Sequence, residues 1–530
     1  MSEEEGKGPT GGDRPPMDRV PALPGAPPGP DIDIESGARS NVRRHEDTER
    51  FDLRRIPGGD RAPVRRLPSG QNLRRLRKLF FGIAFLAIYL LLPTPRDLSV
   101  EGKNAIGLFL FIVYLWVTEA LPLPVTALLA GVGFLALGIR DDPNEAFEPY
   151  AQDAFFFILG SLILADGITK SGADEVLAHR MLSVFGRNTH TLLFGIVASS
   201  AILAAFLSDH VIAAIMLPIV LGILRNTGFK GDPKMAPAFL IAVAFGTNIA
   251  GLATPSGGSR NAVALGYLRD IYDVQVSYLD WMVLAAPLTL VLIPVTYIVI
   301  ALAFRVPFKR LERAKVDPGA YRFTQPQWAA IAILAFTVVL WVLGSERFGL
   351  GAIAILGAVL MFVFGILDWE DTRSTIPWGV AFVYGAALAM GRVLKETLAA
   401  EWLAQHAFLL LPGQGAGIDI LWLLIIIIVV IVIMTNFLSD GATVAVIAPI
   451  TLSLAILAEF DVASMGIITA IASAFAFILV IGTPPNLIIY ASGAVRPKDF
   501  AKAGIPMTIA ALVVLVIAVQ WLWPMLVPGL

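Results

Sequence analysis

Two short stretches of this sequence place an acidic residue inside an otherwise apolar run. "FLSDHVIAAIMLPI" covers residues 206–219, and "FLSDGATVAVIAPI" covers residues 437–450. Seven of the fourteen positions are identical, including Asp209 and Asp440. An ionised carboxylate inside hydrocarbon is costly, and such residues usually bind ions, carry protons or contact a substrate. Both aspartates are therefore candidate functional residues.

A second matched pair of stretches is rich in glycine and proline. "ATPSGGSRNAVALG" covers residues 253–266 and contains Arg260, and "VIGTPPNLIIYASG" covers residues 480–493. Asn261 of the first stretch corresponds to Asn486 of the second. Such breaks free backbone groups from helical bonding: half-helix N-termini favour anions, and freed carbonyls coordinate cations. The chemistry indicated is the binding of small ions.

The composition sets the environment in which these stretches must act. The 530-residue chain is 56% hydrophobic and only 15% charged, and its mean hydropathy is +0.73. A soluble protein carries about 25% charged residues, and a membrane-spanning helix needs about 20 apolar residues. We predict an all-α polytopic membrane protein embedded in the lipid bilayer. Eleven spans are expected, at about 79–95, 104–121, 123–139, 152–168, 236–254, 281–304, 327–344, 351–367, 376–394, 464–481 and 504–526.

Two further apolar stretches, 190–224 and 421–457, contain a polar interruption near the middle. They are predicted to be re-entrant hairpins, which enter the membrane and return to the same side. With this topology most loop Lys and Arg residues are cytoplasmic, as the positive-inside rule requires. The N-terminus is then cytoplasmic and the C-terminus external. The basic residues left outside are Arg96, Lys103, Arg140, Arg269 and Arg347.

The matched stretches divide the chain into two halves after an Arg- and Pro-rich tail, which is expected to be disordered. An odd number of spans between the two copies inverts the second, and inverted repeats with interrupted helices are typical of secondary transporters. The predicted parts are the cytoplasmic tail 1–78; a first half, 79–315, with scaffold helices, hairpin 190–224 and broken helix 236–270; and a second half, 316–530, with hairpin 421–457 and broken helix 464–494.

Other classes of function find little support. The chain has no cysteine, which excludes disulfides and thiol catalysis. It contains no phosphate-binding GxxxxGK[ST] motif for ATP-driven pumping, and nothing indicates a nucleic-acid partner. A hydrolase that uses Ser208, Asp209 and His210 is disfavoured, because three adjacent residues rarely converge on one bond; we predict no enzyme activity. A cation/proton antiporter using Asp209 and Asp440 remains an alternative to anion transport.

Residues 79–530 resemble the divalent anion/sodium symporter family, the carriers of succinate, malate, citrate and sulfate. The motifs that carry the resemblance are "WVTEALPLPVTALL" (116–129), "IPWGVAFVYGAALAMG" (376–391) and "GTPPNLIIYASG" (482–493). The resemblance implies eleven spans with two re-entrant hairpins, a homodimer and elevator-type movement in the cell (plasma or inner) membrane. It implies a small anion as substrate, Na⁺ as the coupling ion and no cofactor.

The resemblance also implies roles for individual residues. Sodium ligands would be Ser208, Asp209 and Gly257 in the first half, and Thr435, Ser439, Asp440 and Gly482 in the second. Substrate contacts would be Ser208, Asp209, His210, Ser439, Asp440, Gly441, Thr483 and Pro484, with Arg260 nearby. The family carries Ser-Asn-Thr at each hairpin tip, whereas this chain carries Ser-Asp-His and Ser-Asp-Gly.

Arg260 suggests a reason for these departures. A guanidinium is always charged, so Arg260 is expected to neutralise Asp209 where Na⁺ would otherwise bind. The matching position of the second half is Pro485. Asp440 would then keep a true cation site, occupied by Na⁺ or H⁺. His210, whose imidazole titrates near neutral pH, would offer a pH-dependent positive charge to the substrate.

Overall fold

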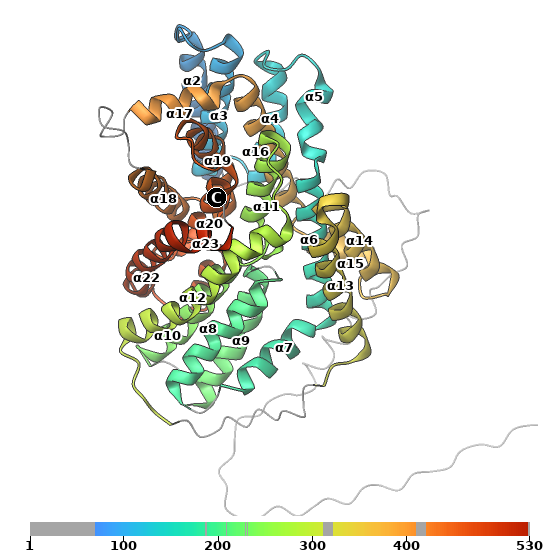
Figure 1. Cartoon of the computed structure of the whole chain (residues 1–530), viewed down its shortest axis with the longest axis vertical. Helices are drawn as coiled ribbons and strands as arrows, with labels where there is room; N and C mark the ends of the chain where they lie inside the picture. Colours follow the sequence, from blue (N-terminus) through green and yellow to red (C-terminus); the bar gives the residue numbers. More distant parts are fainter. Residues whose placement is uncertain are drawn as a thin grey trace, which may run out of the picture. The chain divides into compact units, whose positions relative to one another are not determined.

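The computed structural model describes residues 69–185, 188–207, 209–227, 229, 232–310, 322–409 and 420–527, with only the backbone of 69–72. Most of the predicted tail and Ser208 lie outside the described residues. All regular elements in the described part of the chain are helices, and it contains no strand (Figure 1). The prediction of an all-α membrane protein is confirmed.

Five of the predicted spans and three arms of the predicted hairpins are long apolar helices in the structure. Among the described residues, eight are long and apolar enough to cross a membrane, or nine if the bent pair α15 (Trp369–Thr375) and α16 (Trp378–Glu396), which meet at 59°, forms one span. The eight are α3 (Val100–Thr118), α6 (Asp153–Ser171), α9 (Asp209–Asn226), α12 (Tyr278–Phe304), α13 (Gln325–Phe348), α18 (Ile420–Phe437), α19 (Asp440–Leu457), and α22 (Pro497–Ile517) with its continuation through η5 (Ala518–Leu522) and α23 (Trp523–Leu526).

Several predicted spans are shorter in the structure than the sequence suggested. They have 12 to 16 residues, fewer than the roughly 20 needed to cross the hydrocarbon. Two of them stop where the chain breaks and restarts. The count of eleven spans therefore stays a prediction. The short apolar helices are α4 (Leu123–Ala136), α8 (Thr189–Ala204), α10 (Met235–Ala250), α14 (Leu350–Val363) and α20 (Val462–Ser473).

α2 and several short elements precede or connect the long helices. α2 begins ten residues before the expected start of the first span, because its first turns consist of basic and polar residues that extend the helix beyond the apolar run. Apart from the elements of the two broken helices, these are α2 (Ser69–Leu91), α5 (Pro143–Phe147), η1 (Glu148–Ala151), α7 (Ala173–Ser183), the π-helix η3 (Tyr267–Ile271) and α17 (Ala399–Leu409).

Both predicted broken helices are broken where expected. α10 is followed by η2 (Pro255–Gly257) and α11 (Ser259–Gly266), and α20 is followed by η4 (Val480–Gly482) and α21 (Pro484–Ala491). The two breaks are closed by the same hydrogen bonds. The Asn261 amide donates to the carbonyls ten and seven residues before it, at 2.6 and 2.8 Å, and the Asn486 amide does the same at 2.8 and 3.1 Å. This match supports the predicted internal repeat.

The broken elements pack together at the centre of the helical region. α11 packs on α19 and α20, and α19 also packs on α16; these four helices lie in the middle of the view in Figure 1. Every residue of α10 and most residues of α20 are buried, so the short helices that precede the breaks are shielded by their neighbours. The shielding matters because interrupted backbone is tolerated at membrane depth only where protein or a wet cavity surrounds it.

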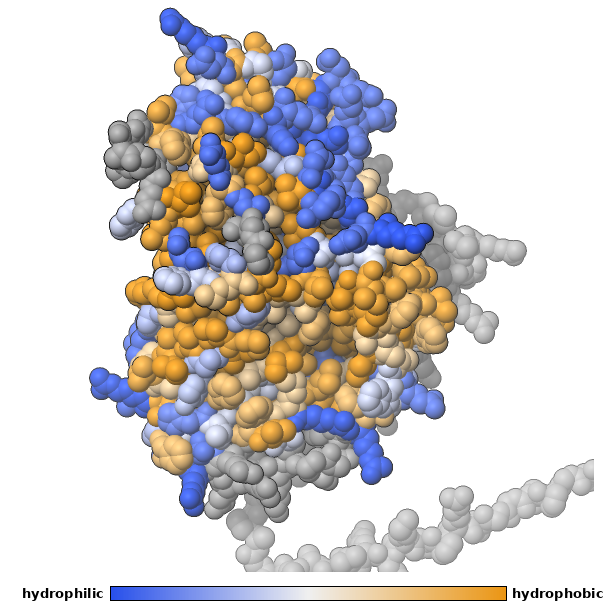
Figure 2. Space-filling view, in the orientation of Figure 1, coloured by the Kyte–Doolittle hydropathy of each residue, from blue (hydrophilic) through white to orange (hydrophobic). Residues whose placement is uncertain are grey.

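Apolar side chains cover much of the outer surface of the helical region. A broad hydrophobic area crosses the face shown in Figure 2, with hydrophilic residues gathered above and below it. On the long helices, Leu290, Leu302 and Leu343 are 67%, 72% and 80% exposed. An apolar surface of this extent marks contact with lipid, since soluble proteins rarely expose such patches.

Ion pairs at the helix ends join segments that the predicted topology puts on the same side of the membrane. One pair lies on the predicted cytoplasmic side and two lie on the predicted outer side. The pairs are Lys170–Asp371, with 3.1 Å between nitrogen and oxygen, Arg269–Asp153, with 2.8 Å, and Arg140–Glu396. The pairing agrees with the order of the spans. The absolute orientation stays a prediction.

Single cysteines test this orientation, because the chain has none of its own. Arg347 and Lys498 are both exposed in the structure. We expect Arg347→Cys to react with a membrane-impermeant maleimide added to intact cells, and Lys498→Cys to react only after permeabilisation. Labelling of Lys498→Cys in intact cells would refute the predicted topology.

Close helix packing around Tyr267 allows a test of the fold. The Tyr267 side chain is fully buried, and its hydroxyl donates to the carbonyls of Ala387 at 2.7 Å and Ala445 at 2.8 Å. A Cβ at Gly391 would lie 1.9 Å from the Tyr267 ring. Gly391→Ala should therefore destabilise the purified protein by about 1–3 kcal/mol, the usual cost of overpacking, and lower its Tm.

The control for this test is Gly222→Ala in α9, where an added Cβ meets nothing within 4 Å. A helical glycine replaced by alanine gains roughly 0.5–1 kcal/mol, so the Tm should stay the same or rise. Equal melting temperatures for Gly391→Ala and the parent protein would show that the packing around Tyr267 is not as described.

Candidate ion and anion site

The two hairpin tips each begin a helix with an aspartate. Asp209 opens α9 and Asp440 opens α19, and each carboxylate accepts the next backbone N–H, from His210 or Gly441, at 2.7 Å. A negative charge is favoured at a helix N-terminus. At the second tip Ser439 is the N-cap, and its hydroxyl accepts from the N–H of Ala442 at 3.4 Å. The aspartates are thus fixed by their own helices.

Arg260 brings these two carboxylates together. Its side chain is wholly buried. Its Nη1 donates to Oδ2 of Asp440 and lies 3.5 Å from Oδ2 of Asp209, and its Nη2 donates to the Asn248 carbonyl at 3.3 Å. Two tips that are far apart in the sequence therefore share one guanidinium. The two halves of the chain therefore meet at one site, as the matched motifs predicted.

The expected division of roles between the two acids is wrong. The sequence hypothesis paired Arg260 with Asp209 alone and left Asp440 free of a fixed cation. In the structure Arg260 binds Asp440 more closely, because α11, which carries Arg260, packs on α19 of the other half. Alignment of the two half-sequences cannot reveal a contact between a residue of one half and a residue of the other.

The guanidinium occupies a space shaped by glycine. A Cβ at Gly251 would lie 2.5 Å from Nη2 of Arg260, and one at Gly258 would lie 3.0 Å from its Cζ. A larger residue at either position would collide with the arginine. Among the described residues, Nε of Arg260 has no hydrogen-bond partner. Gly251 and Gly258 were not among the residues predicted for the site.

His210 is the most exposed titratable side chain of the tips. Its side chain is 38% exposed, against 9% for Asp209 and 10% for Asp440. Its Nδ1 lies 3.4 Å from Oδ1 of Asp209. A solute that approaches the tips can therefore reach His210 more easily than either carboxylate.

The positions expected to bind sodium place neutral oxygens near the glycines of the breaks. A Cβ at Gly257 would lie 2.9 Å from the Ala205 carbonyl, and one at Gly482 would lie 3.2 Å from the Thr435 carbonyl. In each half, the broken helix therefore approaches the end of the first hairpin arm in the same way. The Thr435 hydroxyl donates to the Ser473 carbonyl. Carbonyl and hydroxyl oxygens are ligands that suit hard cations such as Na⁺.

The remaining predicted residues lie at the start of α21 and on the second tip. Thr483 is the N-cap of α21 and accepts the Asn486 N–H at 3.4 Å, and Pro484 is the first residue of that helix. Its missing N–H leaves no donor unpaired there. Ser208 lies outside the described residues. In the described part of the chain, no three His, Cys, Asp or Glu residues form a metal-binding group.

Two further residues of the site were not predicted from the sequence. The Tyr384 hydroxyl donates to Ser259, next to Arg260, and a Cβ at Gly441 would lie 2.2 Å from the Tyr384 oxygen. Asn248 donates to Oδ1 of Asn486 at 3.2 Å and so links the two breaks. Tyr384 directly precedes Gly385 in the motif at 376–391, which was the available signal.

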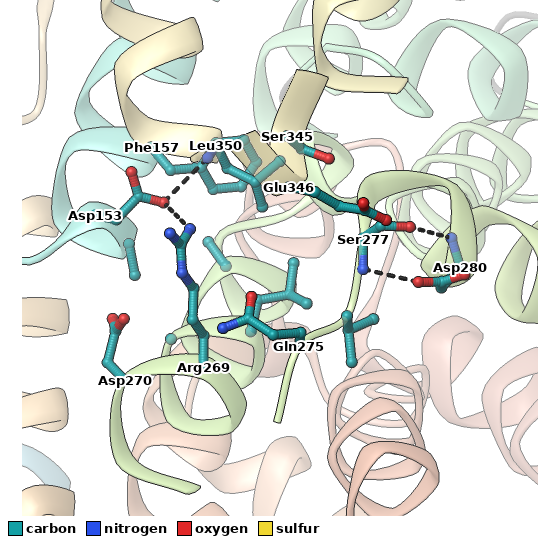
Figure 3. Close-up of a pocket in the computed structure, with 15 residues that line it drawn as sticks. Asp153, Phe157, Arg269, Asp270, Gln275, Ser277, Asp280, Ser345, Glu346 and Leu350 are labelled. Carbon is teal, nitrogen blue, oxygen red and sulfur yellow. Dashed lines mark hydrogen bonds and ion pairs between the residues drawn. The ribbon is translucent and has the colours of Figure 1, made fainter. Parts of the chain in front are cut away.

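A cavity of about 310 Å³ is lined by none of the tip residues. It is bordered by α6, the later part of α11, η3, the start of α12 and the α13–α14 connection (Figure 3). Arg269 reaches across it to Asp153 at 2.8 Å, and the Asp153 carboxylate also accepts the N–H groups of Leu350 and Gly351 at 3.0 and 2.9 Å. The sequence analysis did not predict this cavity.

Comparisons with known proteins show which family the chain resembles. The family model for the sodium:sulfate symporter transmembrane region matches residues 73–528. The sodium-dependent dicarboxylate transporter SdcS of Staphylococcus saprophyticus is 28% identical over 506 residues, which cover 89% of this chain and 96% of the relative. SdcS of Staphylococcus aureus is 28% identical over 479 residues, covering 84% and 91%.

Two solved structures show a more distant likeness. MtrF of Neisseria gonorrhoeae is 15% identical, with coverage of 86% of this chain and 95% of that chain and a TM-score of 0.49. The YdaH transporter of Alcanivorax borkumensis is 15% identical, with coverage of 86% and 99% and a TM-score of 0.48.

The chain belongs to the divalent anion/sodium symporter family, because the family model covers nearly all of its membrane region. It is accordingly a multi-pass membrane transporter rather than an enzyme. The resemblance noted in the sequence is confirmed.

The shared guanidinium gives a direct test of the site. Arg260→Ala should leave two buried carboxylates without a cation and destabilise the protein by about 3–5 kcal/mol, as when one partner of a buried ion pair is removed. Asp440→Asn in the Arg260→Ala background should restore more Tm and more transport than Asp209→Asn, because Asp440 is the closer partner.

Arg373→Ala serves as the control, because Arg373 pairs with Glu370 at an exposed surface and such pairs contribute little. Its Tm and transport should match the parent protein. Equal rescue by the two Asn substitutions would contradict the closer pairing of Arg260 with Asp440.

Proposed function

We propose that this protein is a secondary transporter that moves a divalent anion, such as a dicarboxylate, together with Na⁺. The observation that supports this most is the convergence of both hairpin tips on Arg260 between two broken helices. Interrupted helices that meet around charged side chains are the usual site of substrate and ions in secondary transporters. The relatives named above are sodium-dependent dicarboxylate transporters by name, which supports the same substrate class.

Sodium is proposed to bind beside each break. In the first half the proposed ligands are Gly257 and Ser208, and in the second half they are Thr435, Ser439 and Gly482; Asp209 and Asp440, which were also expected to bind sodium, contact Arg260 instead. The matched approach of each glycine to a hairpin carbonyl supports two equivalent cation positions. No cofactor is needed, because the energy comes from the sodium gradient.

The anion is proposed to bind at the helix N-termini beside His210. The positive ends of α9, α19 and α21 favour negative groups, and the Thr483 hydroxyl, Pro484 and Gly441 lie at the starts of these helices. His210 offers a donor that solvent reaches more easily than either carboxylate. The family resemblance further supports a homodimer and elevator-type movement in the cell membrane.

Cation/proton antiport is less well supported than anion symport. An antiporter needs a carboxylate that is free to exchange ions during the cycle. Here the carboxylates of both Asp209 and Asp440 contact a buried guanidinium, which competes with any exchanging ion. We therefore do not propose antiport.

Uptake measurements test the proposed function. Purified protein in proteoliposomes should accumulate labelled succinate several-fold faster with an inward Na⁺ gradient than with choline, because the gradient supplies the driving force. Unlabelled citrate and sulfate, added in turn, should reveal by competition which anion is preferred. This function would be contradicted if uptake did not depend on Na⁺, or if no divalent anion competed with succinate.

A further inference from the structure

The charges at the tips do not balance without Arg260. Asp209 and Asp440 supply two negative charges, and each is close to fully buried, with side chains 9% and 10% exposed. Buried carboxylates must be paired or coordinate a cation. An anion that binds nearby adds more negative charge, so the tips need positive charge in every step of transport that carries the anion.

We infer that Arg260 is a built-in cation that takes the place of one mobile coupling ion at the carboxylates of the two tips. The inference rests on the proposed function and adds a statement about coupling. Nη1 of Arg260 lies against one oxygen of each carboxylate. A sodium ion at those oxygens would sit beside a permanent positive charge, and the two like charges would repel strongly in this buried environment.

The guanidinium cannot move aside to make room. Its side chain is wholly buried, Nη2 is held by the Asn248 carbonyl at 3.3 Å, and Gly251 and Gly258 enclose it so closely that an added Cβ would collide. An arginine in such a space keeps its charge and its position. The carboxylates of Asp209 and Asp440 are therefore occupied without any ion from solution.

The repeat provides an internal comparison. The position of the second half that matches Arg260 is Pro485, so the chain has one fixed cation for two acids. Arg260 belongs to the first half but binds Asp440 of the second. Mobile sodium is then left with the neutral oxygens beside Gly257 and Gly482, and each transported anion is accompanied by one Na⁺ fewer than if the tip acids bound sodium themselves.

Removal of the fixed charge tests this inference. Arg260→Gln keeps much of the side-chain size but loses the charge, so a sodium ion should enter between the carboxylates. The Tm of the purified variant should rise more on exchange of choline chloride for NaCl, at equal ionic strength, than the Tm of the parent protein. The number of Na⁺ moved per anion, taken from the anion gradient that just balances a set Na⁺ gradient in proteoliposomes, should increase by one.

The matched control is Arg269→Gln, which removes an arginine that binds Asp153 away from the tips and should leave the sodium-dependent rise in Tm and the coupling number unchanged. Asp440→Asn keeps the inference testable if Arg260→Gln does not fold. Since Arg260 already occupies the Asp440 carboxylate, Asp440→Asn should keep the parent's sodium-dependent rise in Tm.

Two results would overturn the inference. One is an equal sodium-dependent rise in Tm for Arg260→Gln and the parent protein; the other is loss of that rise in Asp440→Asn, which would make Asp440 a sodium ligand. Neither result would refute sodium-coupled anion transport, which fails only if the parent protein shows no sodium-driven uptake. The two proposals can therefore be judged separately.

Discussion

The contact of one buried guanidinium with two carboxylates is the constraint on which the rest of this structure depends. Three charged groups away from water are tolerable only when they neutralise one another and their remaining donors and acceptors are occupied. The Asn248 carbonyl and the N–H groups of His210 and Gly441 meet most of that requirement, while Nε of Arg260 has no partner among the described residues. The ion cluster in turn dictates that both hairpin tips and the first break lie together.

The breaks in the helices follow from the same requirement. The backbone N–H and C=O groups of a continuous helix bond to one another, so only its side chains can contact a ligand. An interrupted helix can contact a ligand with both its side chains and its free backbone groups. The cost is unpaired backbone, which the amides of Asn261 and Asn486 offset by binding two carbonyls each. Burial of α10 and α20 among longer helices removes the exposed backbone from lipid. The short length of α10 and α20 and their burial therefore have the same cause.

Much of this arrangement could be predicted from the sequence, because hydropathy and local repeats are properties of the chain itself. The all-helical membrane fold, both breaks and the paired acids of the tips are visible in the residues. The partner of Arg260 is not, since Asp440 approaches it from the other half of the chain. Tyr384 and the cavity beside Asp153 were missed for a related reason: each depends on how separate helices pack, which no periodicity encodes. The expected length of several spans was wrong because hydropathy does not mark where a helix stops.

The cavity beside Asp153 has a mechanical consequence. Arg269 of η3 binds Asp153 of α6, Asp153 in turn binds the first N–H groups of α14, and an open space of about 310 Å³ lies beside these contacts. Where packed apolar surfaces meet, sliding requires many contacts to separate at once. On the cavity side, η3 is held by an exchangeable polar contact, and water can solvate both charges when it breaks, whereas Tyr267 of the same element stays bound to the carbonyls of Ala387 and Ala445. Movement is therefore easiest for the Arg269 side chain, while the buried part of η3 stays in place.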